Sequence, residues 1–351
     1  MKKIVLCALF SLFASSQSWA LSDLEISGEL DVTASVWNLP TGARGNSAFG
    51  VPSLLLDLNA PLKEDNLLVL TLEGSETKTS SGERFDVKVR EAYLDLVSLF
   101  QGMHALRFGL IPDPWQEAQY ETWSYRFLGK DAWAMTEKWK YQNYSDLGLS
   151  FMSELPQNMG EWAFTFSNGE GAEKEEGGPH KEAAFFARLT MWAPWTLSLN
   201  YVRGNYDLYG EDVGLKERIQ AMVTYEVEDQ WLVGLEYLAT KDPADALRDL
   251  KMAEEVDVTA LSGDAVRGQG ASFFTVISTG PKAEVMLRYD YLNAATGEEG
   301  KDLQTVVAAL GYQVTDDIKA ALAVDHTRYG SDFALGARDR SKVELAAQVL
   351  F

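Results

Sequence analysis

The last ten residues of the chain, KVELAAQVLF (342–351), alternate apolar and polar side chains with a period of two residues. Consecutive side chains of a strand point to opposite faces. One face therefore carries Val343, Leu345, Ala347, Val349 and Phe351. The other face carries Lys342, Glu344, Ala346, Gln348 and Leu350. This pattern predicts a terminal strand with one apolar face, which has to be buried against a partner outside the strand.

Similar alternating stretches of about ten residues recur along the whole chain, and turn residues separate them. Sixteen can be counted, at 24–37, 51–60, 66–76, 84–97, 103–111, 145–154, 161–169, 182–192, 195–204, 216–228, 230–239, 268–279, 282–293, 303–314, 317–329 and 342–351. About ten residues is also the length that a tilted strand needs to cross the hydrocarbon core of a bilayer.

The connections between these stretches alternate between short and long. PLKED (61–65), APW (193–195) and TDD (315–317) are examples of tight turns. The long connections are polar, glycine-rich or acidic, and they include 38–50, 112–144, 170–181, 240–267 and 330–341. Strict alternation places all tight turns at one end of the strands, which is typical of outer-membrane barrels and untypical of sandwiches or propellers.

The two faces of the predicted strands agree with a membrane setting. In AEVMLRYDY (283–291), Leu287 falls on the apolar face, whereas Arg288 and Asp290 fall on the other. A basic side chain that faces lipid at mid-bilayer costs about 2–4 kcal/mol, so we expect the charges to point inward. Aromatic residues such as Trp195 and Trp231 lie near strand ends, where rings favour the membrane interface. The alternative, that they pack a soluble core, is disfavoured by the polar face of every strand.

We therefore predict a 16-stranded antiparallel transmembrane β-barrel over residues 21–351, with short periplasmic turns, long external loops and a lipid-facing terminal strand. Pairing of the first and last strands removes both sheet edges, and an even strand number permits antiparallel closure. KVREAYLDL (88–96) is expected to contain a β-bulge, because Val87 and Val89 are out of phase with Leu94 and Leu96.

The first twenty residues, MKKIVLCALFSLFASSQSWA (1–20), have the pattern of a secretory signal peptide: two lysines, a short apolar run and a small-x-small cleavage site. Cys7 is the one cysteine of the sequence, so the mature chain can form no disulfide and no thiolate metal site. The formal net charge of −21 argues against nucleic acid as a partner, since the field repels phosphates. Outer-membrane localisation is expected.

The stretch REAYLDLVSLFQGMHALRFGLIPDPW (90–115) resembles the phosphate-selective porin (O/P-like) family within the bacterial porin superfamily. The resemblance implies a homotrimer of 16-stranded barrels in which the third loop, here 112–144, folds inward, with DAWAMTEKWKY (131–141) as a candidate helix. The terminal Phe351 resembles the signal that outer-membrane proteins present to the barrel-insertion machinery. Unlike anion-selective members, this loop carries about as many acidic as basic residues.

We predict that the narrowest part of the lumen is lined by charged residues of the third loop and of the facing strands. They are Arg107, Asp113, Glu117, Glu121, Arg126, Lys130, Asp131, Arg188, Glu236, Arg288 and Asp290. Acidic residues outnumber basic ones on the predicted inner face, which favours a mild cation preference. Arg107, Arg188 and Arg288 are expected to form a basic strip opposite the acids of the loop.

Motifs for enzymatic chemistry are missing from the sequence. The three histidines, His104, His180 and His326, are not accompanied by a G-x-S-x-G, HExxH or EF-hand pattern. His104 is predicted to lie in a periplasmic turn, and the acidic loop 168–182 is interpreted as a solvated external loop in preference to a weak divalent-cation site. The function expected is passive diffusion of small hydrophilic solutes and ions without a cofactor. Two alternatives stay open, an anion- or phosphate-selective porin and a plugged structural or adhesive barrel.

Overall fold

The computed structural model describes residues 24–38, 47–79, 82–97, 104–129, 132–169, 171–172, 181–208, 211–243, 265–331 and 339–351. The predicted signal peptide (1–20) lies outside these ranges, as do the central parts of the predicted external loops 38–50, 170–181, 240–267 and 330–341. Among the described residues, no helix is long and apolar enough to cross a membrane.

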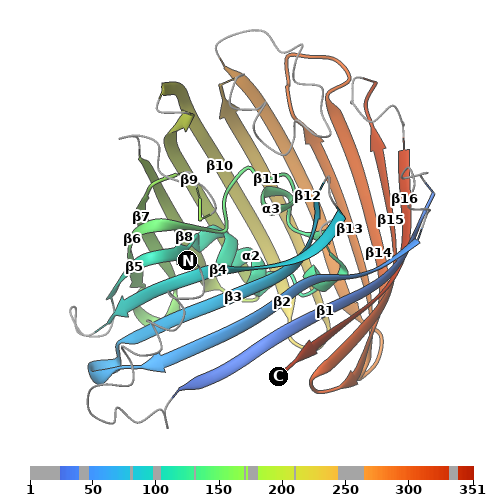
Figure 1. Cartoon of the computed structure of the whole chain (residues 1–351), viewed down its shortest axis with the longest axis horizontal. Coiled ribbons are helices and arrows are strands. Elements are labelled where there is room, and N and C mark those ends of the chain that lie inside the picture. The colour runs from blue at the N-terminus through green and yellow to red at the C-terminus, as the bar shows by residue number, and fades with distance from the viewer. Residues whose placement is uncertain are drawn as a thin grey trace.

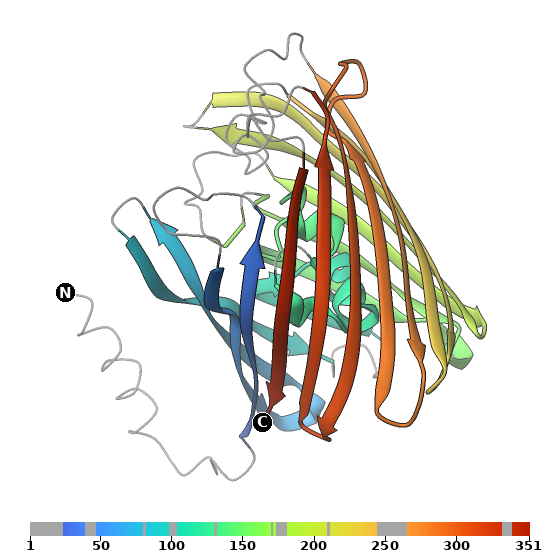
Figure 2. The ribbon, with the colours of Figure 1, turned by 90° about the vertical axis from the view of Figure 1, so that its right-hand side faces the viewer.

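Sixteen strands form one closed antiparallel barrel, in which each strand pairs with its neighbours in sequence and β16 pairs with β1 (Figures 1 and 2). The first eight are β1 (Glu25–Trp37), β2 (Ser47–Pro61), β3 (Leu67–Thr79), β4 (Gly82–Leu96), β5 (His104–Pro112), β6 (Ser145–Glu154), β7 (Gly160–Ser167) and β8 (Glu182–Trp192). The others are β9 (Trp195–Leu208), β10 (Glu211–Val227), β11 (Trp231–Asp242), β12 (Val266–Ser278), β13 (Ala283–Asn293), β14 (Asp302–Thr315), β15 (Ile318–Tyr329) and β16 (Asp339–Leu350). The predicted fold class is confirmed.

The period-two pattern of the sequence appears as an apolar outer wall and a more polar inner wall. On β13, Leu287 is 40% exposed on the outside of the barrel, whereas the neighbouring Arg288 is 1% exposed on the inside. The last strand behaves in the same way, with Val343 and Leu345 outside and Glu344 inside. The apolar face of KVELAAQVLF thus lies on the outer wall.

The barrel closes where the last residue of the chain meets β1. Gly28 and Phe351 exchange two backbone hydrogen bonds, of 2.8 and 3.0 Å. The Phe351 ring covers Gly28, and a Cβ at that position would collide with the ring and lie 2.7 Å from the Leu55 carbonyl oxygen. Glycine is therefore required for this close approach at the seam.

The expectation of strictly alternating short and long connections is wrong at two places. The β3–β4 ladder continues to Thr79↔Gly82, and the β9–β10 ladder continues to Leu208↔Glu211. These strands thus extend into stretches that were predicted as parts of connections, namely residues 77–79, 82–83, 205–208 and 211–215. A ladder needs only backbone hydrogen bonds, so it can continue beyond the apolar belt where the side-chain pattern gives no signal.

The third loop lies inside the barrel, as its helices show in Figure 1. It contains helix α2 (Pro114–Thr122), the 3₁₀ turn η5 (Arg126–Leu128) and the short helix α3 (Met135–Lys138). The helix predicted within 131–141 is limited to α3, and the longer α2 was not predicted. Its signal is present in DPWQE, because Asp113 accepts a hydrogen bond from the Gln116 N–H at 3.0 Å and Pro114 occupies the first helical position.

Candidate functional site: the lumen around the inserted loop

An apolar side of the inserted loop packs against the inner wall of the barrel. Trp115, Tyr125 and Phe127 are fully buried in one cluster that includes Phe274 of β12 and Met286 of β13. A second cluster joins the α3 end of the loop to the wall of β11–β15. Burying one large apolar side chain stabilises a structure by about 1.5–3 kcal/mol, so the loop is held firmly against this side of the lumen.

Arg107 on β5 connects the loop to the barrel wall. Its guanidinium donates to both oxygens of Asp95 on β4, at 2.9 and 3.1 Å, and to both oxygens of Glu117 on α2, at 2.9 and 3.1 Å. Burial raises the pKa of Glu117 to about 7, although the Arg107 charge acts in the opposite direction. Two predicted site residues, Arg107 and Glu117, are thus brought into direct contact.

Two other predicted residues, Arg188 and Glu121, also meet across the space between wall and loop. Arg188 Nη1 of β8 contacts the Glu121 carboxylate at the end of α2 and lies 3.6 Å from Glu161 of β7. Arg126 instead pairs within the loop, with Glu137 at 2.7 Å. Two of the three arginines of the expected basic strip, Arg107 and Arg188, therefore face acids of the loop.

Arg288 is placed differently from the other two arginines. It donates to Asp290 of the same strand at 2.9 Å, and its Nη2 lies 3.9 Å from Glu236 of β11. Glu236 in turn accepts a hydrogen bond of 2.7 Å from Gln119 of α2, while the Trp123 ring lies 4.9 Å from the Arg288 guanidinium carbon. These predicted residues sit behind the loop and hold it, since all three charged groups are covered.

Asp113 combines two roles at the entry of the loop. Besides capping α2, it accepts a hydrogen bond of 2.6 Å from Gln142 Nε2 near the exit, so it joins the two ends of the loop. Burial raises the pKa of Asp113 to about 7. Lys130 and Asp131, also predicted as site residues, lie outside the described residues. Which members of the predicted set line a passage stays a prediction.

The sequence reasoning missed an anchor at the exit of the loop. Arg218 of β10 donates to the Tyr141 carbonyl oxygen at 2.8 Å and to Asp242 of β11 at 2.6 Å, and both charged side chains are 1% exposed. The period-two pattern contains the signal, because Arg218 is in phase with the inward-facing Gln220 and Met222.

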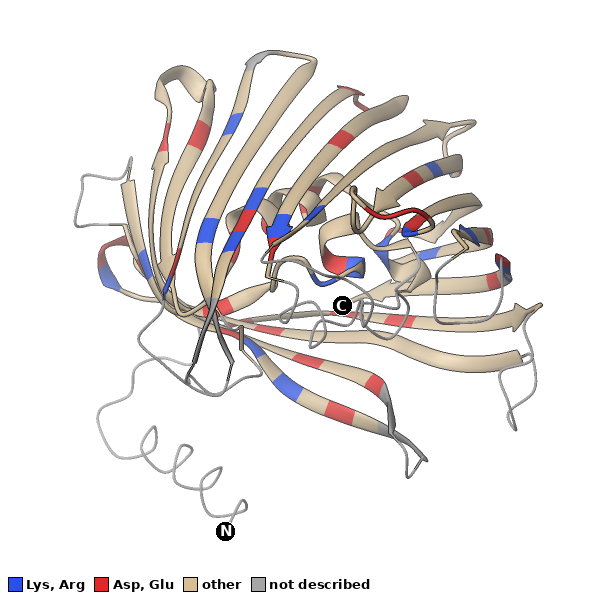
Figure 3. Cartoon of the chain, turned by 90° about the horizontal axis from the view of Figure 1, so that it is seen from above, with Lys and Arg blue, Asp and Glu red and all other residues tan. Residues whose placement is uncertain are grey.

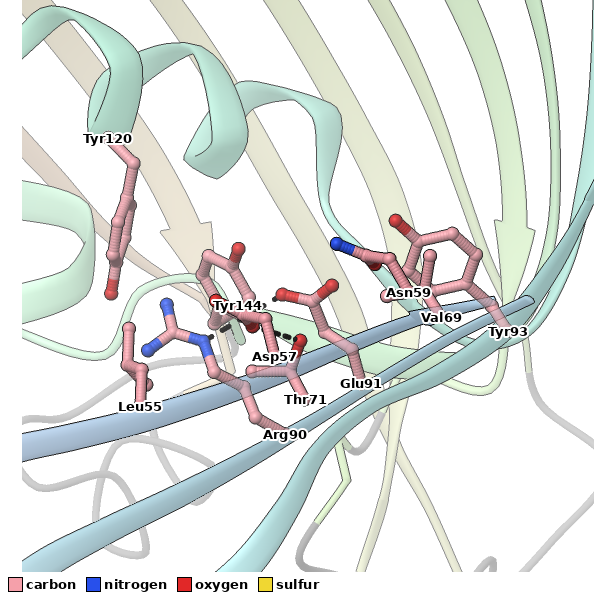
Figure 4. A pocket seen from close by; sticks show the side chains of 10 residues that line it. All are labelled: Leu55, Asp57, Asn59, Val69, Thr71, Arg90, Glu91, Tyr93, Tyr120 and Tyr144. Carbon is pink, nitrogen blue, oxygen red and sulfur yellow. Dashed lines mark hydrogen bonds and ion pairs between the residues drawn. The ribbon is translucent and has the colours of Figure 1, made fainter. Parts of the chain in front are cut away.

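The bulge expected in KVREAYLDL is confirmed. The β3–β4 register passes from Thr71↔Glu91 to Leu72↔Val89, so Arg90 has no partner on β3. As a result the consecutive side chains of Arg90 and Glu91 both point into the lumen and are buried. They line a cavity between the wall of β2–β4 and the inserted loop (Figure 4).

Fixed charges of both signs surround the loop when the barrel is seen from above (Figure 3). The inward-facing arginines at 90, 107, 188, 218 and 288 all lie within ion-pair distance of a carboxylate. By contrast, the inward-facing Glu29, Asp57 and Asp146 form no ion pair with any described residue. The charge that is left uncompensated in the described part of the lumen is therefore negative.

The histidines and the acidic loop give no metal site within the described ranges, where no group of three or more His, Cys, Asp or Glu side chains can hold an ion. His104 is the first residue of β5 and not part of a turn, because it pairs with Ser153 of β6; its ring stacks on Phe151 at 5.6 Å. His326 lies near the outer end of β15 and faces outward beside Ser341. His180 and most of the acidic loop 168–182 lie outside the described residues.

No protein-family model matches the chain, and no curated protein is similar to it in sequence. Solved structures share its fold. OprB of Pseudomonas putida is 9% identical, with a TM-score of 0.65 and 97% of each chain covered. The anion-selective porin from Comamonas acidovorans is 12% identical, with a TM-score of 0.62, and the match covers 93% of this chain and 99% of that one. OmpT of Vibrio cholerae, an outer membrane protein in its trimer form, is 11% identical, with a TM-score of 0.62 and the same coverage.

Proposed function

We propose that this protein is a porin of a bacterial outer membrane, a water-filled channel through which small hydrophilic solutes and ions diffuse passively. The observation that carries the proposal is the asymmetry of the barrel wall, apolar outside and charged inside, around a loop that narrows the lumen. An apolar outer wall fits lipid, and fixed charges inside a narrow lumen fit the passage of hydrated ions.

The channel prefers cations mildly. The uncompensated carboxylates of Glu29, Asp57 and Asp146 support this preference, because fixed negative charge in a low-dielectric passage concentrates cations. The name of one structurally similar protein contains the words "anion-selective", but the fold alone does not determine selectivity, which depends on the residues of the lumen.

The protein reaches the outer membrane after cleavage of the signal peptide at 1–20, and the barrel-insertion machinery recognises the strand that ends in Phe351. Support for the second step comes from the seam, where Phe351 completes the pairing of β16 with β1. A homotrimer is the expected assembly, and the trimeric form of the structurally similar Vibrio cholerae protein supports it.

Single-channel recording tests the proposal. The refolded protein, added to a planar bilayer with a KCl gradient, should give a steady open current and a reversal potential on the cation side. A reversal potential on the anion side would refute the cation preference and favour the anion- or phosphate-selective alternative. The second candidate function, a plugged structural barrel, is favoured by the two apolar clusters that seat the loop, and it predicts no steady current.

A further inference from the structure

A cavity of about 290 Å³ lies between the inner wall of β2–β4 and the inserted loop. Ten residues line it: Leu55, Asp57, Asn59, Val69, Thr71, Arg90, Glu91, Tyr93, Tyr120 and Tyr144 (Figure 4). Its size is at the lower end of the range for small-molecule sites. We call it the bulge cavity, because the β4 bulge places Arg90 and Glu91 in its wall.

Arg90 offers unused hydrogen-bond donors to this cavity. Its guanidinium carbon lies 3.6 Å from the centre of the Tyr144 ring and 4.7 Å from that of Tyr120, which fixes the plane of the group. Its closest carboxylates, Glu73 at 3.6 Å and Glu91 at 3.9 Å, are beyond hydrogen-bond distance, and it donates no hydrogen bond to any described residue. A guanidinium held in this way can bind a carboxylate through two parallel hydrogen bonds.

Two carboxylates of the lining, those of Asp57 and Glu91, offer acceptors for a cation. Asp57 accepts a hydrogen bond of 2.7 Å from Thr71 on Oδ1 only, and it forms no ion pair within the described part of the chain. Glu91 has a long contact with Arg90 and interacts with the side chain of Tyr144. An ammonium group needs acceptors of this kind, since it donates three hydrogen bonds.

Guanidinium groups lie over all three tyrosine rings of the cavity. Arg90 and Arg126 lie over Tyr120, the latter at 4.3 Å, while Arg90 lies over Tyr144 and Arg107 lies over Tyr93. A neutral sugar that stacks on an aromatic ring therefore competes with a guanidinium group at each ring. A solute with anionic groups only is repelled by Asp57 and Glu91, and one with cationic groups only leaves the hydrogen-bond donors of Arg90 unused.

We propose that the bulge cavity binds small zwitterions of the α-amino-acid class, with the carboxylate on Arg90 and the ammonium group on Asp57 and Glu91. The site is thus a solute subsite beside the passage, and this role rests on the proposed channel function. Binding itself does not require conduction, so the two ideas can fail separately.

Titration calorimetry of the purified, detergent-folded barrel with L-alanine tests the site without any membrane. We expect saturable binding of L-alanine, and at least about tenfold weaker binding of acetate and of methylammonium, which each lack one of the two charged groups. Acetate that binds as tightly as L-alanine, glucose that displaces L-alanine, or no L-alanine binding would each overturn the proposal. Steady single-channel current together with absent L-alanine binding would reject the subsite and leave the channel function standing.

Two substitutions locate the binding. Arg90→Gln and Asp57→Asn should each weaken L-alanine binding at least tenfold, and Asp57→Asn keeps an oxygen that can accept the Thr71 hydrogen bond. Asp146→Asn, which removes another uncompensated inward-facing carboxylate outside the cavity, is the matched control and should leave L-alanine binding unchanged. The heat-dependent shift in gel mobility of folded barrels confirms that each variant is folded. Unchanged binding in a folded Asp57→Asn variant would contradict the proposal, even if Arg90→Gln fails to fold.

Discussion

Substitution of Leu287 by arginine tests whether the outer wall of the barrel faces lipid. Leu287 lies in the middle of β13, pairs with Ala308 of β14 and is 40% exposed on the outside. If this wall faces hydrocarbon, an arginine at mid-bilayer lowers the free energy of unfolding by about 2–4 kcal/mol. If the wall faces water, the same substitution at a partly exposed surface position changes stability by about 0.5 kcal/mol or less.

An outward-facing residue near the end of a strand, and so near the membrane interface, provides the matched control. Val314 faces outward on β14, close to the turn that follows this strand, and is 45% exposed. Arginine near the membrane interface costs only about 0–1 kcal/mol, so Val314→Arg should be tolerated where Leu287→Arg is not. The expected difference between the two variants is therefore at least about 1 kcal/mol, or roughly a factor of five to ten in the folding equilibrium.

The assay is denaturant unfolding of the protein in lipid vesicles, followed by tryptophan fluorescence and by the gel-mobility shift of folded barrels. Wild type, Leu287→Arg and Val314→Arg are titrated in parallel, and the stability differences are taken from the transition midpoints at constant slope. Equal stability of both variants, within about 0.5 kcal/mol of wild type, would show that the outer wall is not adapted to lipid. The channel function would then have no physical basis.

Three further predictions concern the seam, the loop anchors and the lumen charge. Gly28→Ala should reduce the folded fraction strongly, because the new Cβ collides at the seam, whereas Gly280→Ala, with open space around it, should fold like wild type in the same gel assay. Asp242→Asn should destabilise the protein by about 3–5 kcal/mol in denaturant unfolding, because the buried Arg218 loses its ion pair with Asp242. Replacing both residues by apolar ones should cost less. The pKa of Glu117 is raised from its usual 4.5 to about 7. Acidification from about pH 8 to about 5.5 therefore protonates this carboxylate and removes a negative charge from the lumen. The reversal potential should then move toward the anion side. Glu117→Gln should reduce this movement, and an undiminished movement would show that Glu117 does not titrate in this range.

Local patterns alone predicted much of the barrel. The two-residue period gives the face of each side chain directly, so the inward position of Arg288 and the outward position of Leu287 required no knowledge of distant residues. The bulge at Arg90 was visible for the same reason, as a local break in phase. The ends of β3, β4, β9 and β10 were not, because a ladder beyond the apolar belt is held by backbone hydrogen bonds that leave no trace in the side-chain pattern.

The sequence by itself therefore determined the strand number, the register of the faces and the closure through Phe351, all of which follow from short-range periodicity and the need to remove sheet edges. Only the tertiary structure decided which charges meet. The loop packs on the wall through apolar side chains that are far apart in sequence. This packing brings Glu117 to Arg107, and it also covers Arg288 behind the loop. Contacts of this kind depend on distances between elements, and a one-dimensional pattern does not contain those distances. The bulge cavity exists for the same reason, since the strand wall supplies eight of its lining residues and the loop supplies the other two, Tyr120 and Tyr144.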